Sequence, residues 1–286
     1  MTETWTIGRV ARWATDDFRA RGLDSPRLEA EVLLAHALGV PRINLFLELE
    51  RPLEPSELAR YRALITRRRA REPVAYLIGE REFYGRPFRV DASVLIPRPD
   101  TETLVEVALS RTAPRSLYGR ALDVCTGSGC VAITIARERP TWRVSATELS
   151  PAALAVARDN AHRLGAHTLA LLEGDLYAPV AGQRFELVTA NPPYIPDREI
   201  DELDADVRDF EPRLALSGGA DGHDLNRRVI GEAARVLAPR GVLAVEIMAG
   251  TAGDVVEMFR AAGFDDVRVT NDHAGRDRVV SGVGPA

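Results

Sequence analysis

Apolar residues in about the first seventy positions recur every three or four residues, the spacing of helices that bury one face. We predict a helix that begins at Ser25-Pro26, where the serine hydroxyl would cap the first turn and proline suits the first helical position. Gly39, followed by Pro41, should end it. Its buried stripe should consist of Leu28, Val32, Leu33 and Leu38.

A second helix is predicted from about Pro55 to Arg71, with Leu58, Tyr61, Leu64 and Ile65 on one face. It ends in the basic run from Arg67 to Arg71, and basic residues in a last turn complement the helix dipole. We expect this run to be a solvated helix end rather than a docking patch. The two helices predict an N-terminal helical domain over residues 1–74.

After Glu72 the pattern changes. Residues 83–90 predict a hairpin with a glycine turn, and residues 96–102 predict a stiff extended segment that leads into a helix through Leu104, Val105 and Val107. Strands and helices then alternate, with strands at 120–124, 142–147, 169–172, 185–190, 242–247 and near Val267 and Val279, and helices at 129–139, 151–163, 225–237 and 252–262. This alternation predicts an α/β fold with a Rossmann-like, mostly parallel, seven-stranded sheet and helices on both faces.

Composition places the chain among ordinary globular proteins, with 45% apolar and 28% charged residues. The net charge of −5 gives no general attraction to nucleic acid. Cys125 and Cys130 form neither a disulfide framework nor a zinc set, and we expect no metal site. The first residues, 1–4, carry no basic region followed by an apolar segment, and no apolar run is long enough to cross a membrane. A cytoplasmic location is therefore expected.

Candidate ligand-binding residues follow three successive predicted strands. Asp123 begins a glycine loop that contains Gly127 and Gly129, which let backbone approach a ligand closely. Glu148 ends the next strand, about twenty residues after the loop, where an acid binds a ribose hydroxyl. Asp175 of Gly174-Asp175-Leu176 could accept from an amino group, and the leucine could pack on a ring. Since such sheets bind ligands at the carboxyl ends of their strands, a nucleoside site is predicted.

Two common nucleotide motifs are excluded. The third glycine of the dinucleotide fingerprint is missing, because residues 126–132 hold only Gly127 and Gly129, and this argues against NAD. A Lys-Ser/Thr pair does not follow the loop, so the segment is not a phosphate-binding P-loop.

The tetrad Asn191-Pro192-Pro193-Tyr194 directly follows the strand-like run at 185–190. The two prolines stiffen the backbone and lack N–H donors. The side-chain oxygen of Asn191 and the carbonyl of Pro192 could therefore accept both hydrogens of an NH₂ group, while the Tyr194 ring could pack on its plane. An Asn-Pro turn after a strand is the common alternative, but the three ligand-binding strand ends upstream favour a grip on a planar nitrogen.

With these motifs the chain resembles the class I S-adenosylmethionine-dependent methyltransferases, and within them the HemK/PrmC family of protein-(glutamine) methyltransferases. The resemblance covers nearly the whole chain. It is carried by residues 71–73, 96–102, 123–129, 191–194, 210–212, 218–222 and 275–280.

The resemblance implies S-adenosyl-L-methionine as cofactor and peptide chain release factors as protein substrate. The implied cofactor-binding residues are Cys125, Thr126, Gly127, Ser128, Gly129, Glu148, Asp175, Leu176 and Asn191. The implied substrate-binding residues are Asn191, Pro192, Pro193 and Tyr194, of which Asn191, Pro192 and Tyr194 would be catalytic. Cys125 stands where the family commonly has glycine, Glu148 where it commonly has aspartate, and Met248 and Thr251 in a segment usually richer in glycine and glutamine.

The expected reaction is direct methyl transfer to the amide nitrogen of a glutamine, in release factors the glutamine of a Gly-Gly-Gln loop. The resemblance also implies that residues 1–74 recognise the substrate, that 75–97 form a hairpin linker, and that 98–286 form the methyltransferase domain. We expect a monomer. Two alternatives stay open: a glutamine of a ribosomal protein, and adenine in DNA, which the acidic composition disfavours. A cofactor-binding module without catalysis is disfavoured by the intact Asn191.

Overall fold

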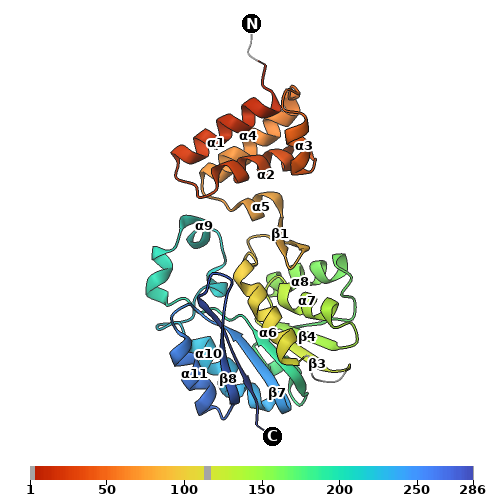
Figure 1. The fold of residues 1–286 in the computed structure, drawn as a ribbon, viewed down its shortest axis with the longest axis vertical. Helices are drawn as coiled ribbons and strands as arrows, with labels where there is room; N and C mark the ends of the chain where they lie inside the picture. The colour runs from red at the N-terminus through yellow and green to blue at the C-terminus, as the bar shows by residue number, and fades with distance from the viewer. Residues whose placement is uncertain (1–3, 113–116, 286) are drawn as a thin grey trace. The chain divides into compact units, whose positions relative to one another are not determined.

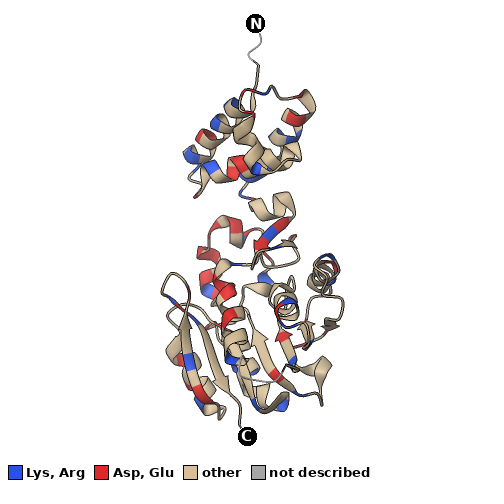
Figure 2. Cartoon of the chain, turned by 45° about the vertical axis from the view of Figure 1, so that its right-hand side comes forward, with Lys and Arg blue, Asp and Glu red and all other residues tan. Residues whose placement is uncertain are grey.

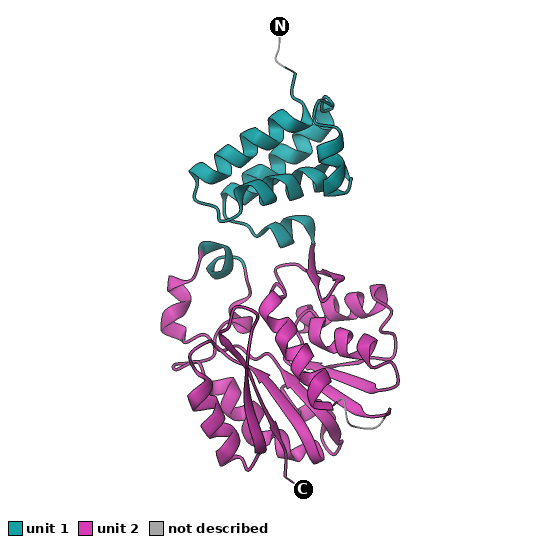
Figure 3. Cartoon of the chain, viewed as in Figure 1, with its two compact units in different colours: residues 1–79, 205–210 teal, residues 80–204, 211–286 magenta. Residues whose placement is uncertain are grey.

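The computed structural model describes residues 4–112 and 117–285, and the extreme N-terminus considered above for a secretory signal lies largely outside them. The chain divides into two compact units (Figures 1 and 3). Residues 1–79 and 205–210 form unit 1, and residues 80–204 and 211–286 form unit 2. Each unit has its own hydrophobic core.

Unit 1 is helical. Its helices are α1 (Ile7–Ala20), α2 (Pro26–Leu38), α3 (Arg42–Leu47), α4 (Pro55–Arg69), α5 (Val74–Ile78) and α9 (Ala205–Arg208). Its core contains the fully buried side chains of Phe18, Leu33, Leu34, Tyr61 and Ile65. The two helices predicted from the sequence are confirmed as α2 and α4, within two residues at each end.

Two details predicted for α2 are wrong. Its buried face is built around Ala30, Leu33, Leu34 and Ala37, and Leu28 is 48% exposed because two residues of helix rotate it away from Ala30. The Ser25 hydroxyl makes no capping hydrogen bond. The backbone of Ser25 has ψ 58°, which is not the extended conformation in which a side chain reaches back to the first turn.

The prediction of a solvated basic end for α4 is wrong for one residue. Arg68 is 3% exposed, and its guanidinium contacts the carboxylates of Glu29 at 2.8 Å and Asp206 at 2.7 Å. Arg67 pairs with Glu72 and Arg69 with Asp17. Because a buried guanidinium requires compensating charge, the acids of other segments specify where this helix end lies within unit 1.

The Tyr61 hydroxyl donates to the carbonyl of Ala30 at 2.9 Å in the unit 1 core. We expect Tyr61→Phe to lower the free energy of unfolding of unit 1 by about 1 kcal/mol, the usual net value of such a bond. Amide hydrogen exchange of α2 and α4 measures this. Tyr84→Phe, which makes the same change in unit 2, should leave these amides unaffected, and equal protection in Tyr61→Phe and wild type would contradict the prediction.

Unit 2 begins with the predicted hairpin. Strands β1 (Glu80–Phe83) and β2 (Arg86–Arg89) pair antiparallel, so the hairpin begins three residues and ends one residue earlier than predicted. Tyr84 and Gly85 form the turn with φ of 51° and 69°. Two consecutive positive φ values match the twist of a two-residue hairpin turn.

The main sheet confirms the predicted seven-stranded, mostly parallel arrangement. Its strands are β3 (Arg120–Val124), β4 (Arg143–Glu148), β5 (Ala170–Glu173), β6 (Phe185–Ala190), β7 (Leu237–Glu246), β8 (Asp265–Asn271) and β9 (Asp277–Val283). They lie in the order β5-β4-β3-β6-β7-β9-β8, and only the pairs that involve β9 are antiparallel. After β3 the chain adds β4 and β5 towards one edge of the sheet, and after β6 it adds the remaining strands towards the other edge. A crevice is therefore expected where β3 and β6 end side by side.

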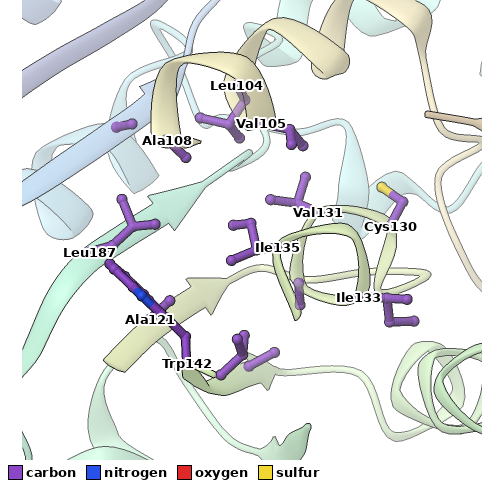
Figure 4. Packing of buried hydrophobic residues seen from close by; sticks show 14 of the residues in the cluster. Leu104, Val105, Ala108, Ala121, Cys130, Val131, Ile133, Ile135, Trp142 and Leu187 are labelled. Atoms are coloured by element: carbon purple, nitrogen blue, oxygen red, sulfur yellow. The ribbon is translucent and has the colours of Figure 1, made fainter. Parts of the chain in front are cut away.

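Helices cover both faces of this sheet (Figure 1). On one face lie α6 (Glu102–Thr112), α7 (Cys130–Glu138) and α8 (Pro151–Arg163), and on the other α10 (Asp224–Glu232) and α11 (Ala252–Ala261). Figure 4 shows side chains of α6 and α7, among them Leu104 and Ile135, packed with Leu187 of β6. Short 3-10 turns complete the unit at η1 (Pro99–Thr101), η2 (Ala178–Val180), η3 (Asp197–Glu202), η4 (Arg213–Ala215) and η5 (Ala233–Arg235).

The predicted helix at 225–237 is too long at its end. It stops at Glu232, and β7 begins at Leu237, five residues before the predicted strand. Leu237 pairs with Phe185 of β6 and is buried, so sheet pairing overrides the helical pattern of its neighbours. Within the described residues, no helix is long and apolar enough to cross a membrane.

Candidate functional site

A cavity of about 210 Å³ lies within unit 2 at the carboxyl ends of the central strands. The residues of three strand ends line it, as do parts of the segment before α6. Of the residues predicted from the sequence, Cys125, Thr126, Gly127, Ser128, Glu148, Asp175, Leu176, Asn191 and Pro193 contribute to the lining. Gly129, Pro192 and Tyr194 lie next to these residues in the chain but are not among the described lining residues.

Asp123, which is 2% exposed, holds the start of the glycine loop in place through hydrogen bonds. Its carboxylate accepts from the hydroxyls of Thr126 at 2.6 Å and Thr189 at 2.7 Å. Burial raises the pKa of Asp123 to about 6, although both hydroxyl bonds act to lower it. The acid therefore ties the loop after β3 to β6, the strand that carries the tetrad.

The loop has a backbone that glycine adopts most easily. Cys125, Gly127 and Gly129 have φ of 58°, 54° and 81°. A β-carbon on Gly129 would lie 2.9 Å from the end of the Ile133 side chain and 3.3 Å from the β-carbon of Ala157 in α8, so glycine suits both the crowding and the positive φ here. A β-carbon on Gly127 would meet no atom within 4 Å, so a ligand can approach that backbone closely.

Cys125 adopts this left-handed conformation without being glycine, at the position where the resemblance implies glycine. Burial and the nearby carboxylates of Glu148 and Asp123 raise the pKa of its thiol well above the ordinary value. A thiol held in its neutral form is a poor nucleophile. These surroundings suit a small packing residue rather than a nucleophile.

Glu148 is the last residue of β4 and is 9% exposed. Both of its carboxylate oxygens accept hydrogen bonds from backbone N–H groups. Oε2 accepts from the N–H of Gly127 at 2.9 Å, and Oε1 accepts from the N–H of Ser150 at 2.9 Å. Each carboxylate oxygen can accept a second bond. The side chain can therefore hold the glycine loop and still bind hydroxyl groups of a ligand in the cavity.

Leu176 and Asp175 follow β5, and both line the cavity. Leu176 is 5% exposed with φ 44°, a strained conformation that turns the chain sharply after Gly174. Asp175 pairs with Arg228 of α10 at 2.6 Å, and Arg228 also lines the cavity. The apolar side chain of Leu176 and the ion-paired carboxylate of Asp175 thus line the cavity together.

The tetrad begins directly after β6. Asn191 is half-buried, lines the cavity and donates from Nδ2 to the hydroxyl of Thr101 at 3.3 Å. The hydroxyl of Tyr194 donates to Glu246 at 3.3 Å. Burial and the neighbouring Glu246 raise the pKa of Tyr194 well above its usual value, so the hydroxyl stays a donor.

The glycine-rich segment 218–222 packs against the backbone of Tyr194 in the tetrad. A β-carbon on Gly218 would lie 2.8 Å from the Cα of Tyr194, and one on Gly222 would lie 2.6 Å from its carbonyl oxygen. Ile195 also exchanges backbone hydrogen bonds with Leu216 and Gly218 at 3.0 and 2.9 Å. The close backbone contact explains why glycines recur at these two positions.

Sequence comparison agrees with this arrangement. Residues 9–79 match the PrmC N-terminal domain family, and residues 100–206 match the methyltransferase small domain family. A release factor glutamine methyltransferase from Geobacter sulfurreducens is 45% identical over 280 residues, which cover 98% of this chain and 97% of the relative. One from Moorella thermoacetica is 46% identical, with 97% of each chain covered.

The chain belongs to the release factor glutamine methyltransferase family. Solved structures support the fold. A methyltransferase from Pyrococcus furiosus has a TM-score of 0.53 at 18% identity and covers 79% of this chain and 98% of its own. The catalytic domain of hMettl16 has a TM-score of 0.57 at 14% identity, with 75% and 81% covered. A methyltransferase domain of this fold implies S-adenosylmethionine-dependent catalysis.

For this family member, the residues at the site that sequence reasoning missed include Thr101, Arg228 and Glu246. Thr101 and Arg228 line the cavity, and Glu246 bonds the tetrad tyrosine. Thr101 stands in the segment 96–102 that carried part of the resemblance, and Glu246 ends a parallel strand as Glu148 does. An acid at the end of a central strand, as at Glu148 and Glu246, was thus a usable signal, whereas α10 gave no sign that Arg228 reaches the cavity.

Proposed function

We propose that this chain transfers a methyl group from S-adenosylmethionine to the side-chain amide nitrogen of a glutamine in a peptide chain release factor. The observation that carries the proposal is similarity along nearly the full length to enzymes that bear this name, together with an intact Asn-Pro-Pro-Tyr tetrad at the end of β6. The tetrad adjoins a cavity with the features of a nucleoside site.

The residues of the cavity fit S-adenosylmethionine, which supplies a methyl group on a positively charged sulfur. The open space at Gly127 admits close contact with the loop, and the Glu148 carboxylate has acceptor capacity left for the ribose hydroxyls. Leu176 offers an apolar surface for the adenine ring, and Asp175 an acceptor for its amino group. Cys125, Thr126, Ser128 and Gly129 complete the proposed cofactor-binding loop.

The tetrad would orient the glutamine. The Asn191 side-chain oxygen and the Pro192 carbonyl accept the two hydrogens of the substrate amide, and Pro193 and Tyr194 shape the pocket around its plane. An amide nitrogen is a weak nucleophile because its lone pair is delocalised. Two fixed acceptors direct that nitrogen at the methyl group and stabilise the positive charge that grows on it. A strong general base is not needed, since the nitrogen becomes acidic only as its bond to the methyl carbon forms and the sulfur–methyl bond of the donor breaks, and its surplus proton would then pass to water.

Residues 1–74 would recognise the release factor, residues 75–97 would link, and residues 98–286 would carry out the transfer, with the protein acting as a monomer. The proposed target is the glutamine of a Gly-Gly-Gln loop. The segment after the tetrad argues against DNA as substrate, because Asp197, Glu199, Asp201, Glu202 and Asp204 make it acidic. Figure 2 shows the acidic positions that gather on these turns. Such charge repels a phosphate backbone.

The direct test incubates purified release factor with methyl-labelled S-adenosylmethionine and this protein, followed by peptide mass spectrometry. We expect one added methyl group on one glutamine. A release factor in which that glutamine is replaced by alanine serves as the control and should gain no label. Parallel incubations offer ribosomal protein or DNA in place of the release factor, and label on either of these, with none on the release factor, would overturn the proposal.

A further inference from the structure

Thr101 links the tetrad to the segment before α6. It is the last residue of η1 and is 2% exposed, and its hydroxyl oxygen accepts from Asn191 Nδ2 at 3.3 Å. Both side chains line the cavity. Since the amide nitrogen of Asn191 is engaged by Thr101, the amide oxygen is the atom left for a ligand.

Glu246 contacts Tyr194, another residue of the tetrad. It ends β7, is 1% exposed, and accepts from the Tyr194 hydroxyl at 3.3 Å. The Thr101 hydroxyl lies near this carboxylate and acts to lower its pKa. Glu246 Oε2 is buried and has no hydrogen-bond partner within the described residues, so it has room to accept one from the Thr101 hydroxyl. Hydrogen bonds in catalytic sites often tighten only when substrate is bound.

The directions of these bonds are coupled. An ionised carboxylate only accepts, and a hydroxyl has a single hydrogen to give. While Thr101 gives its hydrogen to Glu246, its oxygen can only accept from Asn191, and the amide of Asn191 must keep its NH₂ towards Thr101. A flipped amide would present a donor to a substrate NH₂ group, and two donors repel.

We propose that Glu246 and Thr101 are positioning residues that fix the orientation of the Asn191 amide, so that its oxygen faces the glutamine. The inference rests on the proposed function and adds to it the reason why Asn191 has one orientation rather than two. Glu246 also holds the ring of Tyr194 through its hydroxyl. One buried carboxylate thus sets both polar side chains of the tetrad.

The same arrangement depends on pH. Burial raises the pKa of Glu246 to about 7, while Thr101, Arg278 and Tyr194 act to lower it and Asp100 acts to raise it. Arg278 is itself paired with Asp100 and Asp272 at 3.2 Å each. As the pH falls through about 7 the carboxyl gains a proton and can donate to Thr101, which frees the Thr101 hydrogen to turn towards Asn191. Methyl transfer should therefore decline on the acid side.

The first experiment compares Thr101→Val with wild type, using release factor as the methyl acceptor. Valine keeps the shape and removes the hydroxyl, and we expect kcat to fall about tenfold, the value of one good hydrogen bond. The Kd of S-adenosylmethionine should change by less than about threefold, and Thr101→Ser should restore most of kcat. Thr103→Val is the matched control, because Thr103 is equally buried and its hydroxyl has no hydrogen-bond partner among the described residues.

The second experiment tests whether Thr101 acts through Asn191. In an Asn191→Ala background, Thr101→Val should lower kcat by less than about twofold, because no amide remains to be oriented. Glu246→Gln should lower kcat in the wild-type background and abolish the acid limb of its pH profile, with cofactor Kd as the measure of intact folding. A full tenfold loss in the Asn191→Ala background, unchanged kcat in Thr101→Val, or an acid limb that persists in Glu246→Gln would overturn the inference.

The outcomes separate this inference from the proposed function. If wild type labels no release factor, the proposed function fails. If wild type labels it and Thr101→Val labels it equally fast, the proposed function stands and only the positioning role fails.

Discussion

Replacing Asn191 by alanine is expected to lower kcat by about 10²–10³-fold, the loss seen when one preorganised polar group is removed from a site of developing charge. The substitution deletes the proposed side-chain acceptor and leaves only the Pro192 carbonyl to hold the amide. The nitrogen would then rotate away from the methyl group, and its growing positive charge would lose a partner. Substrate that binds mainly through other residues should keep a similar KM.

Single-turnover transfer of labelled methyl to release factor measures this loss, and calorimetry gives the cofactor Kd in parallel. Asn271→Ala is the control, because Asn271 lies in β8 and its amide donates to the Gly275 carbonyl on an exposed turn. Its kcat should equal that of wild type. Undiminished turnover in Asn191→Ala would remove the tetrad from the chemistry, whereas a loss confined to cofactor Kd would make Asn191 a cofactor ligand only.

The elements nearest to the site could be predicted from the sequence because their signals are local. A strand that runs directly into a glycine loop or into Asn-Pro-Pro-Tyr has its boundary marked by residues that cannot continue it. Strands β3 and β6 accordingly have the predicted bounds. The start of β7 was missed because it is set by pairing with Phe185, about fifty residues away in the chain, which no local pattern encodes.

The same distinction holds for the site. The proposed cofactor residues follow successive strands, so the topology of a parallel sheet was enough to bring Cys125, Glu148 and Asp175 around one cavity. The contacts of Asn191 and Tyr194 come from residues 90 and 52 positions away. Only the packing of η1 and β7 against the tetrad places Thr101 and Glu246 there.

Arg68 illustrates a third kind of error. One arginine in a basic run at a helix end is correctly expected to be solvated in most proteins. Here Glu29 lies 39 residues earlier in the chain and accepts two hydrogen bonds from Arg68, and Asp206 pairs with it from a segment far along the sequence. The charge pattern of a single helix does not show which of its cations is paired, because the partner acids belong to other elements.

Removing the carboxylate of Glu148 is expected to weaken binding of S-adenosylmethionine by about 100-fold. Two ribose hydroxyls would each lose a charged acceptor, and one bond to a charged group contributes about 1.5–3 kcal/mol. Glu148→Ala would also free the N–H groups of Gly127 and Ser150, which the carboxylate now holds at 2.9 Å. Glu148→Asp keeps the charge at a shorter reach, so it should recover most of the affinity.

The control for this prediction is Glu173→Ala. Glu173 ends β5 directly opposite Glu148 in the sheet register, but its side chain is exposed and it does not line the cavity. An effect of general negative charge at this edge of the sheet would weaken cofactor binding in both variants, whereas direct contact weakens it only in Glu148→Ala. Equilibrium titration with the cofactor alone distinguishes them.

At saturating cofactor Glu148→Ala should regain much of its kcat, which Asn191→Ala cannot do, because one residue binds the methyl donor and the other orients the acceptor. If saturating cofactor does not restore kcat in Glu148→Ala either, Glu148 does more than bind ribose, and the proposed division of roles between β4 and β6 is wrong.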